Sequence, residues 1–179
     1  LDDSTGGASY LNDNTQPLPL SWSNGWGLFL QGAVKSWLSV AAPALVSLNT
    51  TSTNLSRYVD TVNDDQYISL DVQDPENTAP IGIALCGANE CVSASNEVAV
   101  ASVLWNTMAG SGMLGMGKVW DAFDNGMTVH PVSIESFWEA FLAANPADAG
   151  TLATVFQNRQ VRYAADGYEP DDSAAAAQT

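Results

Sequence analysis

Large apolar side chains recur at helical spacing along most of this chain, and that periodicity limits the folds open to it. From near Asn24 a broad apolar stripe follows the i, i+3, i+4 pattern: Trp26, Phe29, Leu30, Ala33, Val34, Trp37 and Leu38. The pattern predicts an amphipathic helix, which Pro43 ends or kinks. The run from Trp26 to Val46 approaches the length of a membrane span, but Lys35 interrupts it, so no membrane insertion is expected.

Further helices are expected in the second half of the chain. Ser95 or Asn96 is placed to cap one helix, whose apolar stripe is Val98, Ala101, Leu104, Trp105 and Met108. Ser133 is placed to cap another, with an apolar face of Ile134, Phe137, Trp138, Phe141 and Leu142. A short helix is expected over residues 118–124 and a last one over about 147–160.

A β-hairpin is expected at about residues 67–92. Tyr67 to Val72 and Ile81 to Leu85 alternate or run apolar, with a turn sequence between them. Cys86 and Cys91 enclose four residues at one end of this region. In an exported protein this spacing predicts a local disulfide, and two free thiols are the alternative. A zinc site would need more ligands, and no other Cys or His is close in sequence.

These signals predict a mainly α fold with a small antiparallel β-hairpin. A compact helical domain over residues 21–163 is flanked by extended arms, residues 1–20 and residues 164–179. Gly, Asn and Pro make the first arm polar and loop-like, and the second is acidic and then alanine-rich. The arm residues expected to make contacts are Tyr10, Leu11, Leu18, Leu20, Tyr168, Ala174, Ala175 and Ala176.

The charge of the chain is strongly one-sided. Its 179 residues include 20 acidic and five basic side chains, a net charge of −15. Such a charge repels phosphate backbones and anionic lipid, so binding to nucleic acid or to a membrane through a basic face is not expected. It also drives identical chains apart unless salt or divalent cations screen it.

We expect the protein to be secreted. The chain starts at Leu1 and has no leader pattern, which we interpret as a removed signal peptide or as an internal piece of a longer product. Residues 47–56 are rich in Ser, Thr and Asn and hold N-glycosylation sequons at Asn49 and Asn54. The alternative is an unmodified surface loop.

No standard catalytic pattern is present in the sequence. The single histidine, His130, can build neither a triad nor a His pair for zinc, and we expect it in a turn. Carboxylates cluster at residues 64–65, 71–76 and 169–172 without EF-hand spacing. These clusters are either a solvated acidic surface or a place for calcium, and no other cofactor is expected.

Several segments resemble secreted bacterial zinc metallopeptidases of the gluzincin type. Leu20 to Phe29 (LSWSNGWGLF) is similar to a helix with the pattern A-W-S-E-G-W-A-x-F, whose Glu is the third zinc ligand. Thr5-Gly6-Gly7 resembles the glycine stretch before that helix, and residues 97–105 and 137–141 look like later parts of such proteins. Asp166 to Ser173 (DGYEPDDS) resembles the opening D-x-Y-E-P-N-D-S of the pre-peptidase C-terminal domain, a β-sandwich appended to extracellular peptidases.

The departures from this pattern are functionally important. The H-E-x-x-H helix, which carries two zinc ligands and the general base, is absent, and Asn24 stands where the third ligand would be. The resemblance therefore implies a peptidase-like domain without zinc chemistry, an inactive pseudoenzyme. The alternative is that the chain is a processed segment of an active metallopeptidase whose H-E-x-x-H segment lies elsewhere.

The arms suggest a role in assembly. Segments of this composition do not order by themselves, and we expect neighbouring copies to hold them. Such contacts propagate when they do not close on themselves. The hypothesis is a non-enzymatic structural subunit that binds other copies of itself in an extracellular filament. The alternative is a monomer whose arms fold back on its own domain.

Overall fold

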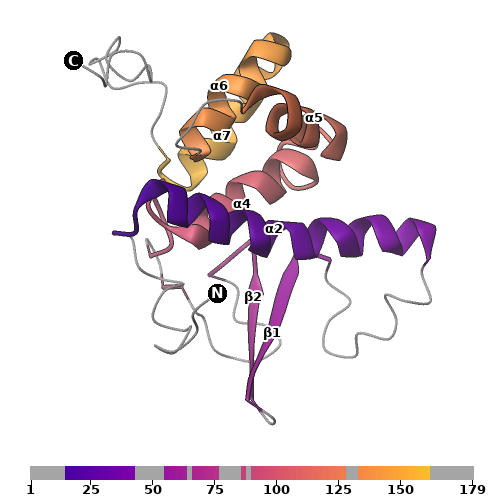
Figure 1. The fold of residues 1–179 in the computed structure, drawn as a ribbon, viewed down its shortest axis with the longest axis vertical. Coiled ribbons are helices and arrows are strands. Elements are labelled where there is room, and N and C mark those ends of the chain that lie inside the picture. Colours follow the sequence, from indigo (N-terminus) through magenta and orange to yellow (C-terminus); the bar gives the residue numbers. More distant parts are fainter. Residues whose placement is uncertain are drawn as a thin grey trace.

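The protein is described by a computed structural model that covers residues 15–42, 55–63, 66–76, 86–87, 90–127 and 133–161. Within these ranges helices dominate, and one two-stranded antiparallel sheet accompanies them (Figure 1). The predicted fold class, mainly α with a small antiparallel β-hairpin, is confirmed. Residues 1–14 and 162–179, most of the two predicted arms, lie outside the described residues.

The longest element is helix α2, Leu18–Ala41, which has 24 residues. The helix begins at Leu18, six residues before Asn24, near which its apolar periodicity was predicted to start. The prediction that Leu18 and Leu20 belong to an extended arm is therefore wrong. Pro17 and Pro19 had indicated a loop, but Pro19 lies in the first turn of the helix. Amide hydrogens in that turn have no intrahelical acceptor, so proline loses nothing there.

Helix α4, Glu97–Met108, lies at the centre of the described fold. Every residue of it except Asn106 is buried, which explains why its sequence is apolar on nearly all sides. The side chain of Asn96 accepts a hydrogen bond from the amide of Ala99 at 2.8 Å, which confirms the predicted cap. α2 crosses α4 closely, with Gly25 against Val100 and Gly32 against Trp105.

The sheet pairs β1, Arg57–Asn63, with β2, Gln66–Asp71, so that Arg57 lies opposite Asp71. β1 is a strand that the sequence analysis did not predict, and it supplies the partner that β2 has among the described residues. A two-residue connection joins β1 to β2, and so short a loop closes at low entropic cost. The other predicted strand, residues 81–85, lies outside the described residues.

The last helices pack on the other side of α4. They are α5 (Met116–Asp121), the π-helical turn Ala122–Gly126, α6 (Ile134–Ala144), the 3-10 turn Pro146–Asp148 and α7 (Ala149–Asn158). Ser133 caps α6 as predicted, accepting from the amide of Ser136 at 3.2 Å. The ring of Trp22 stacks on Phe123 and Phe137, with centroids 6.4 Å and 6.0 Å away, and so ties α2 to this group.

The crossing of α2 over α4 generates a stability prediction. A Cβ on Gly25 would lie 2.6 Å from the Cβ of Val100 and 2.7 Å from the carbonyl oxygen of Glu97, whereas one on Gly27 would meet nothing within 4 Å. We expect Gly25→Ala to lower the free energy of unfolding by about 1–3 kcal/mol. Gly27→Ala, the control in the same helix, should raise it by about 0.5–1 kcal/mol. Urea unfolding measures both, and equal effects would contradict the close crossing.

Candidate interaction surface

α2 is longer than the helix that it packs on. Its 24 residues span about 36 Å, whereas the 12 residues of α4 span about 18 Å. The last buried residue of α2 is Ala33. The following part of α2 reaches past the other described helices in Figure 1, and none of residues 34–41 is fully buried.

This part of α2 carries an exposed apolar face, which we call the α2 end face and define as Val34, Trp37 and Val40. Their exposed fractions are 46%, 67% and 86%. Residues three apart lie on one side of a helix, so the three side chains form one patch. Single exposed apolar residues are common, but a contiguous group with a tryptophan is typical of an interaction site. Val34 and Trp37 belong to the apolar stripe that was predicted from the sequence, and the structure leaves both of them exposed.

The α2 end face is free of negative charge. α2 contains no Asp or Glu, and Lys35 is its one charged residue. The ammonium group of Lys35 donates a hydrogen bond to the carbonyl oxygen of Arg57, at the start of β1. Partial burial, and then the charge of Arg57, lower the pKa of Lys35. In a chain of net charge −15, this helix therefore offers a surface without acidic side chains.

Three further residues to which the sequence analysis gave a role, Leu18, Leu20 and Asn24, all lie in α2. Leu18 is half-buried and Leu20 is 41% exposed, both in the first turn of α2. Asn24, the residue at the expected zinc-ligand position, is half-buried in the same helix. The following residues lie outside the described part of the chain: Tyr10, Leu11, Asn49, Asn54, His130, Tyr168, Ala174, Ala175 and Ala176.

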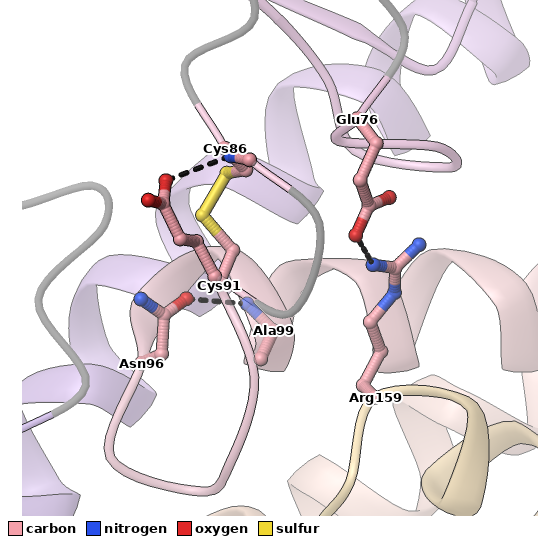
Figure 2. The surroundings of a disulfide bond; sticks show 8 residues. Glu76, Cys86, Cys91, Asn96, Ala99 and Arg159 are labelled. Carbon is pink, nitrogen blue, oxygen red and sulfur yellow. Dashed lines mark hydrogen bonds and ion pairs between the residues drawn. A yellow bond between two sulfur atoms is a disulfide. The ribbon is translucent and has the colours of Figure 1, made fainter.

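Cys86 and Cys91 form a disulfide, as their spacing predicts (Figure 2). Both residues are buried, and the bond lies beside the Asn96 cap at the start of α4. The carboxylate of Glu90 accepts a hydrogen bond from the amide of Gly87 at 2.7 Å, inside the same small loop.

An ion pair joins the segment after β2 to the end of α7. The guanidinium of Arg159 donates to the carboxylate of Glu76 at 2.7 Å, close to the disulfide in Figure 2. Burial opposes ionisation of Glu76, but the hydrogen bond and charge of Arg159 outweigh it and hold its pKa below the ordinary value. Burial, and then the hydrogen bond and charge of Glu76, raise the pKa of Asp74.

The described carboxylates of the 71–76 cluster have partners within the protein. Asp71 is buried and accepts from the hydroxyl of Ser56 at 2.6 Å and from the amide of Gln73 at 3.1 Å. Among the described residues, no three His, Cys, Asp or Glu side chains are grouped to hold a metal ion. None of the described helices is long and apolar enough to cross a membrane.

Comparison with protein-family models, curated proteins and solved structures finds no match to this chain. The resemblance to metallopeptidases and to the pre-peptidase C-terminal domain therefore stays a prediction from the sequence.

The ion pair predicts a pH-dependent stability. The pKa of Glu76 in the folded protein lies below its ordinary value of 4.5, so its ionised form stabilises the fold above that pH, and this contribution is lost as the pH falls through the folded pKa. We expect Glu76→Gln to lower the free energy of unfolding at pH 7 by about 0.5–1 kcal/mol, since water partly screens the pair. The difference from the parent protein should shrink below about pH 4.

Asp74→Asn is the matched control for this prediction. Its carboxyl has a raised pKa, so the folded state favours the protonated form, and that contribution is present at low pH and lost as the pH rises. The amide variant should therefore be neutral or slightly stabilising at pH 7. Urea unfolding at pH 7 and pH 3.5 measures both variants, and a deficit in Glu76→Gln that is equal at the two pH values would refute the assigned role of the pair.

Proposed function

We propose that this protein is a non-enzymatic, secreted structural subunit that assembles with other copies of itself into an extracellular polymer. The observation that carries the proposal is the exposed, acid-free α2 end face on a chain that otherwise repels its own copies. An exposed apolar face favours association with a protein partner. Because this face has no acidic side chain, another acidic chain approaches it at little electrostatic cost.

The energy of such a contact is dominated by Trp37. Two-thirds of its side chain is exposed, an area on the order of 100–150 Å². At about 25 cal/mol per Å², covering it contributes about 3 kcal/mol before the entropic cost of association. This is large enough to direct where two copies meet. By itself it is too small to hold them together.

A polymer needs a second contact, and we assign that contact to the terminal arms. A self-complementary face closes a pair and then stops, whereas an arm that reaches into a neighbour propagates. The arms carry apolar residues suited to this: Tyr10, Leu11, Tyr168, Ala174, Ala175 and Ala176. Leu18 and Leu20 leave this set because they are part of α2.

Secretion is part of the same proposal. The Cys86–Cys91 disulfide is compatible with an oxidising compartment outside the cell. The peptidase-like pattern, with Asn24 in place of a zinc-binding Glu, is consistent with a domain that has kept its helices and lost its chemistry.

The proposal is tested on the full chain by electron microscopy and sedimentation over a range of salt concentrations. Because the copies repel one another, we expect polymers to increase as salt rises from about 10 mM to 150 mM and the Debye length falls from about 30 Å to about 8 Å. Deletion of residues 164–179 should abolish polymers and leave the thermal unfolding of the domain unchanged.

Two results would count against this function. Discrete monomers at every salt concentration would contradict self-assembly, and unchanged polymers in the deletion variant would remove the C-terminal arm from it. Metal analysis on the same samples addresses the enzymatic alternative, since stoichiometric zinc would indicate a processed segment of an active metallopeptidase.

A further inference from the structure

We infer that the α2 end face binds the same face of a second copy, with the two helices antiparallel and a two-fold axis passing beside Trp37. This inference rests on the proposed function in that it requires copies to associate. It goes further because it names the contact and its symmetry. Experiment can therefore overturn this contact without overturning the proposed function, and the reverse.

The apolar pattern of the end face is symmetric about its centre. Val34 lies three residues before Trp37, and Val40 lies three residues after it. In an antiparallel pair centred on Trp37, each Val34 meets the other copy's Val40, and the two tryptophans meet at the axis. A two-fold contact requires this reciprocity, in which residue i meets j and j meets i.

Antiparallel pairing also keeps the two acidic bodies apart. The crossing with α4 lies in the first part of α2, with Gly25 against Val100, and Gly25 is about 18 Å along the helix from Trp37. Turning one helix around places the two crossings on opposite sides of the axis, about 36 Å apart along the pair. This exceeds the Debye length of about 8 Å at physiological salt, whereas parallel helices would set the two bodies side by side.

Ser39, a polar residue beside the face, has a hydrogen-bond partner within one copy, so covering it carries little penalty. Its hydroxyl donates to the carbonyl oxygen of Ser36 at 2.6 Å. A buried polar group costs most when its partner is missing. The rim of the face is therefore already suited to lie against apolar side chains.

The contact is small for a protein interface, because each copy contributes the eight residues 34–41 of one helix. Stable complexes usually bury about 1,200–2,000 Å² in total. We therefore expect a weak pair in which the arms, by raising the effective concentration, keep the two faces together.

Cross-linking of the full chain tests the geometry. We expect a Val34→Cys variant mixed with a size-tagged Val40→Cys variant to form a mixed disulfide dimer at least fivefold faster than either variant forms one with itself. Thr151→Cys, exposed on α7, is the control for random collision. The native cysteines do not interfere, since Cys86 and Cys91 are paired. Homodimers as abundant as mixed dimers, or cross-linking no faster than the control, would overturn the antiparallel pair.

A charge placed at the axis tests the energy of the contact. Trp37→Glu puts two like charges together and should weaken dimer formation in sedimentation at least tenfold, with unfolding unchanged because the side chain is largely exposed. Met113→Glu, at a residue that is 78% exposed and lies outside α2, adds the same charge and should have little effect. Equal weakening by both variants would overturn the inference.

The two proposals fail differently. If polymers form normally with Trp37→Glu, the α2 contact is overturned and self-assembly through the arms stands. If the mixed disulfide forms specifically but no polymers appear at any salt concentration, the contact stands and the proposed function fails.

Discussion

The close crossing of α2 over α4 organises the described fold. Gly25 brings the backbone of α2 against Val100, and the remaining surface of the buried helix α4 contacts α5, α7 and, through Trp105 and Gln73, the segment after β2. The aromatic contacts of Trp22 with Phe123 and Phe137 depend on the same placement of α2. A side chain at position 25 would push the two helices apart and disturb each of these contacts.

The same crossing produces the surface on which the proposed function depends. A helix of 24 residues anchored at its first half on a helix of 12 must extend beyond it. The unsupported part keeps an apolar face, Val34, Trp37 and Val40, and has no acidic residue. The core contact and the interaction surface are thus two parts of one continuous stripe, divided where α4 ends.

Local signals in the sequence were reliable where the physics is local. The caps at Asn96 and Ser133 and the Cys86–Cys91 disulfide were predicted, because each depends on residues only a few positions apart. The start of α2 was missed, since Pro19 favours the first turn of a helix as well as a loop. The partner of β2 was missed too, because apolar alternation marks a strand without saying which other strand it meets.

By itself, the sequence determined that the chain is mainly helical, that it is strongly acidic, and which side of each helix is apolar. These properties follow from residue spacing and from counting charges. Only the tertiary structure decided that the last buried residue of the α2 stripe is Ala33, that Val34 and Trp37 are exposed, and that Leu38 is half-buried. Periodicity shows which face of a helix is apolar, but what covers that face depends on the length and position of elements distant in sequence, here the 12 residues of α4.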